Sequence, residues 1–223
     1  MAPDPRPIRA VLWDMGGVLT TSPFEAFARY EQHHGLPADF IRSINATNPD
    51  GNAWARLERG ELDPQGFDSA FAQESESAGH RVPGGDVLAL LAGAPRPEML
   101  RAVAACRERA TTALLTNNME PLDASDPDIA AVLTLFDVVC QSSTMGTRKP
   151  EPEFYSEACR RAAVDPNDVV FLDDLGINLK PARAMGMRTI KVESPGSALD
   201  ELARITGWPV SATDMSEESQ RDG

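Results

Sequence analysis

Five short apolar segments separated by helical patterns place the strongest constraint on how this chain can fold. The apolar segments are 8–13, 111–115, 136–140, 169–172 and 189–192. Each has the length of a strand, and several are almost continuously apolar, as strands buried on both faces are. Helical patterns occupy 97–109, 152–163, 175–185 and 197–206. This alternation predicts an α/β fold, a doubly wound, Rossmann-like parallel sheet with helices on both faces.

The interval between the first strand and the first of these helices breaks the alternation. It is roughly 75 residues long, too long for a structureless loop in a compact domain, and it carries helical patterns at 24–34, 38–46, 53–59, 64–77 and 86–91. We expect a helical cap at 21–96, inserted into a core formed by 1–20 and 97–210, and a flexible polar tail at 211–223. Because ligands of open α/β sheets bind outside the carboxyl ends of the strands, such an insertion is placed to cover a site. Extra surface helices are the simpler alternative.

Charge and composition exclude several classes of partner. Lys and Arg number 21 against 34 Asp and Glu, a net charge of −13, which disfavours nucleic acid and anionic membranes. No stretch approaches the ~20 apolar residues that span a bilayer, and the beginning of the chain lacks the apolar run of a signal peptide, so we expect a cytoplasmic protein. Cys106, Cys140 and Cys159 lack metal-ligand spacing and lie in apolar segments, which predicts buried, reduced thiols. The sequence leaves the oligomeric state open.

Polar residues gather where the predicted strands end. Because the carboxyl ends of parallel strands meet at one edge of a sheet, these residues are expected to converge there. Each group alone has an ordinary explanation, as a turn, a helix cap or a solvated loop residue. Their order and spacing together favour a site. The groups are Asp14 with Gly16 and Gly17, Thr116 with Asn117, Lys149, and Asp173 with Asp174.

This arrangement resembles the haloacid dehalogenase-like hydrolase superfamily. The motifs of that superfamily are a strand ending in a nucleophilic Asp, a strand ending in Ser or Thr, a Lys, and an acidic pair. They match Asp14, Thr116, Lys149 and Asp173-Asp174 respectively. Within the superfamily, the stretch 169–183 is most similar to the amino-terminal phosphatase domain of soluble epoxide hydrolase. The resemblance covers nearly the whole chain up to about Trp208.

The resemblance implies a magnesium cofactor. A carboxylate attacks phosphorus only if the repulsion between the two anions is screened, and Mg²⁺, which prefers hard oxygen ligands, provides that screening. By this resemblance Asp14, the backbone carbonyl of Gly16 and Asp174 would hold the ion. Asp173 would be a second or water-mediated ligand.

The resemblance also implies roles toward the substrate. Asp14 would form an aspartyl phosphate, a covalent intermediate that divides one difficult step into two. Lys149 would neutralise the nucleophile and the phosphoryl oxygens. The Thr116 hydroxyl and the backbone amides near Asn117 and Gly17 would hold the phosphate, and Asn178 would orient the acidic loop. The function expected is therefore that of a Mg²⁺-dependent, phosphatase-like hydrolase of a small phosphorylated metabolite.

One position departs from the pattern of the superfamily. Most of its phosphatases carry a second Asp two residues after the nucleophile, as a general acid and base, and here that residue is Gly16. Losing such a group typically costs ~10² to 10⁴ in rate. Three explanations stay open: a substrate with a good leaving group, replacement by a cap carboxylate such as Glu58 or Glu61, or a phosphate-ligand-binding or regulatory module with weak turnover. A dehalogenase, which also uses a nucleophilic Asp, is a further alternative.

Overall fold

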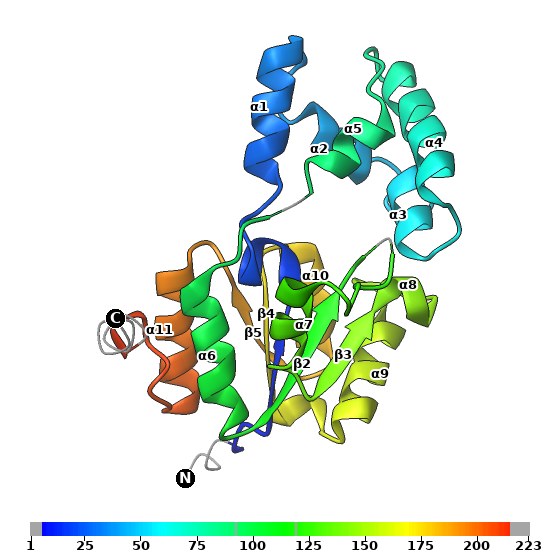
Figure 1. Cartoon of the computed structure of the whole chain (residues 1–223). Helices are drawn as coiled ribbons and strands as arrows, with labels where there is room; N and C mark the ends of the chain where they lie inside the picture. The colour runs from blue at the N-terminus through cyan, green and yellow to red at the C-terminus, as the bar shows by residue number, and fades with distance from the viewer. Residues whose placement is uncertain (1–5, 92, 119, 215–223) are drawn as a thin grey trace.

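The computed structural model describes residues 6–91, 93–118 and 120–214. Its core is a five-stranded sheet in the order β3-β2-β1-β4-β5, with every pairing parallel (Figure 1). The prediction of a doubly wound α/β core is confirmed, and each predicted strand overlaps an observed one. The strands are β1 (Ala10–Trp13), β2 (Thr111–Thr116), β3 (Val138–Gln141), β4 (Val169–Asp173) and β5 (Arg188–Lys191).

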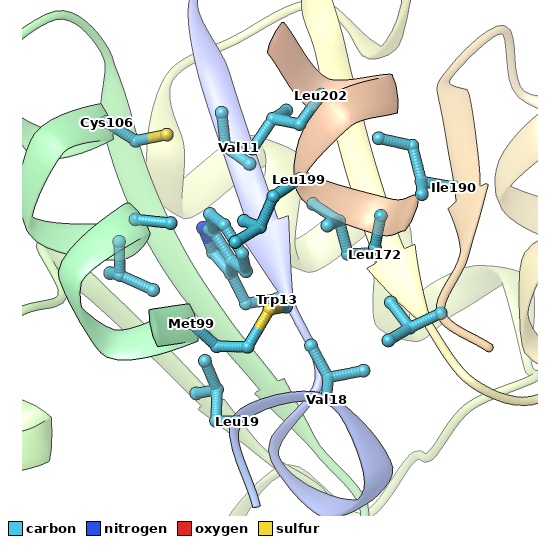
Figure 2. Packing of buried hydrophobic residues seen from close by; sticks show 14 of the residues in the cluster. Val11, Trp13, Val18, Leu19, Met99, Cys106, Leu172, Ile190, Leu199 and Leu202 are labelled. Atoms are coloured by element: carbon cyan, nitrogen blue, oxygen red, sulfur yellow. The ribbon is translucent and has the colours of Figure 1, made fainter. Parts of the chain in front are cut away.

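Helices cover both faces of the sheet. One face carries α6 (Pro97–Arg107) and α11 (Pro195–Thr206), where Met99, Cys106, Leu199 and Leu202 pack against Trp13 of β1 and its neighbours (Figure 2). The other face carries α9 (Pro152–Ala162) and α10 (Gly176–Ala184). Strands β1 and β4 are buried along their whole length, because apolar side chains on both sides of a strand need a helical layer on each face.

Two helices and two irregular turns lie outside the set predicted from the sequence. Helix α7 (Pro127–Leu133) has no fully buried residue, so it lacks the apolar stripe on which periodicity depends. It is instead capped by Asp126, whose side chain accepts from the amides of Asp128 and Ile129. Helix α8 (Ser142–Met145) is only four residues long. The turns are η1 (Met15–Leu19) and η2 (Pro166–Asp168).

Five further helices stand together over one end of the sheet (Figure 1). They share an apolar cluster of their own, which includes Phe27, Ile41, Leu57, Phe67 and Phe71. This cluster is separate from the two that flank the sheet, so the inserted segment buries its own small core. The helices are α1 (Phe24–His34), α2 (Phe40–Ala46), α3 (Ala53–Glu58), α4 (Pro64–Ser77) and α5 (Gly84–Ala89). We refer to them together as the cap.

The two chain segments that join the cap to the core run side by side. Thr20 and Pro95 form an antiparallel bridge. The amide of Thr21 donates to the carbonyl of Ala94, and the amide of Arg96 donates to that of Leu19, each at 2.8 Å. The cap is therefore attached to the core on this side by a paired double linker.

Three smaller expectations can be compared with the structure. All three cysteines are buried free thiols, as predicted. Within the parts of the chain that the structure describes, no helix has both the length and the apolar character needed to cross a bilayer. Most of the predicted tail, residues 215–223, lies outside the described residues. Its first part is held in place, since Ser211 and Asp214 bond to each other and the Ala212 amide donates to Asp200.

Candidate active site

The register of the sheet brings the carboxylates of β1 and β4 together. Trp13 lies opposite Leu172 in the parallel pair, so the residues that follow them, Asp14 and Asp173, are neighbours at the carboxyl edge. The amide of Asp14 continues the ladder by donating to the carbonyl of Leu172 at 3.0 Å. Two anions are thus fixed side by side by backbone pairing alone.

Lys149 lies between these two carboxylates. Its Nζ is 2.7 Å from Asp14 Oδ1 and 2.8 Å from Asp173 Oδ2, and the residue is 1% exposed. Burial by itself would lower the pKa of the ammonium, but the charges of Asp14 and Asp173 hold that pKa above its ordinary value. Lys149 is therefore a buried cation that offsets the negative charges of Asp14 and Asp173. The alternative that Lys149 is an ordinary solvated loop residue is wrong.

Two asparagines hold this centre in place. The side-chain amide of Asn178 donates to both oxygens of Asp173 at 3.1 Å, and the amide of Leu175 adds a third bond at 2.8 Å. Asn117 binds both backbone groups of Lys149: its Oδ1 accepts from the Lys149 amide and its Nδ2 donates to the Lys149 carbonyl, each at 2.9 Å. Such double bonding fixes the loop that carries the lysine.

The donor set fits a divalent cation. Asp14, Asp173 and Asp174 each offer a carboxylate oxygen, and these oxygens lie within 4.8 Å of one another. Burial, followed by the charges of Asp173 and Asp174, raises the pKa of Asp14 well above its usual range, even though Lys149 opposes the shift. The single positive charge of Lys149 does not balance the negative charge of three neighbouring carboxylates. Hard oxygen ligands with excess negative charge suit Mg²⁺.

Gly17 makes room for the third carboxylate. Its φ is +76°, a left-handed conformation that residues with a side chain rarely adopt. A Cβ atom at this position would collide with the carboxylate of Asp174. Gly16, by contrast, has open space where its Cβ would project, so the packing around it does not explain why an acidic residue is missing there.

The close approach of these carboxylates predicts that the stability of the metal-free chain depends on pH. Burial, together with Asp173, raises the pKa of Asp174 to about 6 from an ordinary value of 3.8. The folded state therefore binds this proton more tightly than the unfolded state, and stability is lost as the pH rises from about 4 to about 6. Urea unfolding with a chelator present should show Asp174→Asn gaining about 2 kcal/mol relative to wild type between pH 4.5 and 7.5. A difference that stays constant over this range would contradict the prediction.

A cavity of about 530 Å³ opens between this centre and the cap. From the core it is lined by Asp14, Gly16, Thr116, Asn117, Arg148, Lys149 and Asp174. The cap contributes six apolar side chains and five polar or charged ones. The apolar ones are Pro23, Phe24, Phe27, Ala46, Pro49 and Trp54, and the others are Arg42, Asn45, Asp50, Asn52 and Glu58. Leu175 and Ile177 extend the apolar wall from the core side. The cavity thus has a charged floor and an upper wall in which aromatic rings lie among polar side chains.

Most of the residues that the sequence singled out line this cavity, and the others lie just behind it. Asp173 is fully buried beneath Lys149, and the Gly17 carbonyl accepts from Arg96 at 3.0 Å. Of the two cap carboxylates considered, Glu58 lines the cavity. Glu61 lies outside its wall and pairs with Arg59 at 2.6 Å.

Arg148 and Trp54 are among the cavity-wall residues that sequence reasoning did not single out. Arg148 directly precedes Lys149, yet a loop arginine has no strand-end position to mark it. Trp54 lies on α3 among ordinary interleaved charges. Only the packing of the cap against the core shows that both residues line the cavity.

Residues 8–186 match the haloacid dehalogenase-like hydrolase family. The chain belongs to this family. The predicted similarity to soluble epoxide hydrolase is also found: the chain is 33% identical over 216 residues to bifunctional epoxide hydrolase 2 of Mus musculus, covering 90% of this chain and 39% of that protein. The chain spans 20% to 39% of the length of the mammalian relatives that it matches.

Two other proteins match over most of their length. The sesquiterpene phosphatase astK of Aspergillus oryzae is 27% identical over 207 residues, covering 89% of this chain and 97% of that protein. A haloacid dehalogenase-family enzyme of Bacteroides thetaiotaomicron, solved with magnesium and inorganic phosphate, superposes with a TM-score of 0.56 at 23% identity, covering 82% of this chain and 93% of that one. The second likeness shows that the two share a fold.

Proposed function

We propose that this hydrolase is a Mg²⁺-dependent phosphatase that transfers the phosphoryl group of an apolar phosphate ester to Asp14. The observation that carries the proposal is the position of the Asp14 carboxylate, which lines the cavity while its Oδ1 is 2.7 Å from the buried Lys149 Nζ. An oriented carboxylate beside a fixed cation is suited to nucleophilic attack on an anionic phosphate.

The reaction would proceed in two displacements at phosphorus. In the first, an Asp14 carboxylate oxygen attacks phosphorus, and the bond from phosphorus to the ester oxygen breaks. The leaving oxygen takes the electron pair and a proton from water in the cavity, and the hydroxide left behind takes up the proton released in the second step. In the second, water attacks the aspartyl phosphate, the bond from phosphorus to the Asp14 oxygen breaks, and inorganic phosphate and a proton are released. Lys149 offsets the negative charge in both steps.

The residues around Asp14 would prepare the site for these displacements. Asn117 fixes the backbone of Lys149, and Asn178 fixes Asp173, so the charges need little rearrangement during reaction. Asp14, Asp174 and the Gly16 carbonyl would hold the ion, with Asp173 as a second or water-mediated ligand. Bound there, Mg²⁺ would neutralise charge on the phosphoryl oxygens. The Thr116 hydroxyl, at the cavity floor, would bind a phosphoryl oxygen.

The upper cavity favours an apolar body on the substrate. Phe24, Phe27 and Trp54 present ring surface there, and each buried methylene of a ligand is worth about 0.8 kcal/mol. The match to a protein described as a sesquiterpene phosphatase agrees with a hydrocarbon chain in this space.

Phosphate release from matched substrates tests the proposal. n-Hexyl phosphate and glucose 6-phosphate both release a primary alcohol, so they differ in the body rather than in the leaving group. We expect kcat/KM to be at least about tenfold higher for n-hexyl phosphate, with release abolished by a chelator. A preference for glucose 6-phosphate would contradict the apolar site. Acetyl phosphate and glucose 1-phosphate, which need little protonation, would show how Gly16 is tolerated.

Gly16 favours one alternative, a module that binds a phosphorylated ligand with little turnover. The same protein samples distinguish the two functions. A binding module would be stabilised against heat by n-hexyl phosphate with Mg²⁺ while releasing no phosphate, since any ligand that binds only the folded state raises the unfolding temperature. A phosphatase would consume the ligand.

A further inference from the structure

Glu58 is a buried carboxylate that joins the cap to the core. It is the last residue of α3, it is 6% exposed, and it lines the cavity. Its Oε2 lies 2.6 Å from the Nε of Arg148 and 3.4 Å from the Nδ2 of Asn117, both in the core. Its Oε1 accepts from the indole nitrogen of Trp54 at 3.0 Å. The charge pair is shielded from water, because only 13% of the Arg148 side chain is exposed.

Both core partners of Glu58 are joined directly to Lys149, one through the chain and one through hydrogen bonds. Arg148 precedes Lys149 in the chain, and Asn117 holds the amide and the carbonyl of Lys149. Arg148 also donates to the carbonyl of Pro49 in the cap at 3.3 Å. One cap carboxylate is thus in contact with the residue that precedes Lys149 and with the asparagine that bonds both backbone groups of Lys149.

This contact lies away from the covalent attachment of the cap. The double linker joins α1 and α5 to the core on one side, whereas α3 meets the core near α8 on the other (Figure 1). The cavity is lined from both sides, by Pro23 and Phe24 near the linker and by Glu58 and Arg148 opposite. The cap is thus held to the core at two separate places, the linker and the contacts of Glu58.

We propose that Glu58 is a positioning residue that couples closure of the cap to the placement of Lys149. This inference rests on the proposed phosphatase function. When the cap is closed, Glu58 holds Arg148 and Asn117, and through them the backbone of Lys149 beside Asp14. When the cap opens for substrate entry or product release, these contacts break and the loop that carries the lysine loosens.

The contacts of Glu58 argue against the role of proton donor. Trp54 donates to Oε1 and Asn117 to Oε2, while the Arg148 guanidinium lies beside Oε2 as a charge partner. These groups favour the ionised carboxylate, which has no proton to give. Burial raises the pKa of Glu58, and Arg148 is the main opposing influence. Arg59, the next residue, pairs instead with Glu61 and Glu151.

Kinetics of a mutant cycle test the coupling. Glu58→Gln, Arg148→Gln and the double variant are compared with Glu76→Gln, whose carboxylate forms an exposed cap pair with Arg81. We expect each single variant to lose about 10- to 100-fold in kcat/KM, and the double variant to be no slower than the slower single one, because the two side chains act as a unit. Glu76→Gln should stay within twofold of wild type. Additive losses, or a Glu58→Gln variant within twofold of wild type, would overturn the proposal.

The leaving group separates positioning from proton donation. p-Nitrophenyl phosphate needs little protonation on departure, whereas n-hexyl phosphate needs it fully. If Glu58 is a positioning residue, Glu58→Gln should lower kcat by the same factor with both substrates. A loss confined to n-hexyl phosphate would show that Glu58 is a general acid, and the positioning role would be wrong.

Hydrogen exchange tests the coupling without turnover. In Glu58→Gln, amide exchange should accelerate at least threefold in peptides covering 52–60 of the cap and 146–151 of the core, because both lose a fixed contact. Acceleration in the cap alone, or in neither, would overturn the proposal. Should Glu58→Gln fail to fold, Arg148→Lys, which keeps the charge but loses the guanidinium geometry, is expected to show the same paired acceleration. If wild type releases no phosphate and Glu58→Gln still shows faster exchange in both segments, the phosphatase function is contradicted and the coupling is supported.

Discussion

Replacing Asp14 with Asn is expected to lower phosphate release by about 10⁴-fold or more, a loss typical of removing a covalent nucleophile. The amide is nearly the same size as the carboxylate but carries no negative charge with which to attack phosphorus. Lys149 keeps Asp173 as a partner at 2.8 Å, so the variant should fold. Phosphate release from n-hexyl phosphate with Mg²⁺ measures the loss.

The same variant identifies the intermediate. Acid quenching of wild type during turnover should trap a phosphorylated protein, and peptide mass spectrometry should locate the group on Asp14. Asp14→Asn should show no such species. The control is Asp128→Asn, which removes an exposed carboxylate in the first turn of α7 and should leave both readouts unchanged. Hydrolysis by Asp14→Asn at the wild-type rate would show that Asp14 is not the nucleophile.

Replacing Lys149 with Met is expected to damage both activity and stability. The thioether chain fills a similar volume but leaves Asp14 and Asp173 without their cation. Breaking a buried pair from one side typically costs about 3–5 kcal/mol, and we expect a loss of that size in urea unfolding at pH 7. Because Lys149 offsets charge on the phosphate, kcat/KM should fall by about 10² to 10³.

The pH dependence of this loss identifies its cause. Asp14 already has a raised pKa because it is buried among carboxylates, and removing Lys149 raises that pKa further. As the pH falls, Asp14 in the variant takes up a proton more readily than in wild type and then needs no cation, so the difference in unfolding free energy should shrink. Lys180→Met, at an exposed position of α10, is the matched control and should show little change. A loss of equal size at pH 4.5 and 7 would point to packing rather than charge.

Much of the core was predictable because the apolar runs are short, continuous and separated by helical periodicity. The predicted first helix of the core, 97–109, and the observed α6 (Pro97–Arg107) begin at the same residue, where Pro is favoured at the start of a helix. Helix α7 was not predicted, because it packs with a partly exposed surface rather than an apolar stripe.

The convergence of the site was also predictable, for a topological reason. Asp14, Thr116 and Asp173 each lie where a strand ends, and parallel pairing carries those ends to one edge. The role of Lys149 could not be argued from its own neighbourhood, because a lysine before a proline is usually solvated. Its burial depends on Asp14 and Asp173 being close enough to offset the cost of desolvation.

The sequence by itself determined the α/β core, the inserted helices and the acidic strand ends, because these follow from local periodicity and from the geometry of parallel sheets. Only the tertiary structure decided which cap carboxylate faces the cavity. Glu58 and Glu61 are three residues apart, but α3 ends at Glu58 and Gly60 turns the chain with a φ of +73°. Glu61 is thereby directed to Arg59, while Glu58 meets Arg148 across the boundary between cap and core. A contact between residues so distant in the chain is set by how the two parts pack, which no local pattern encodes.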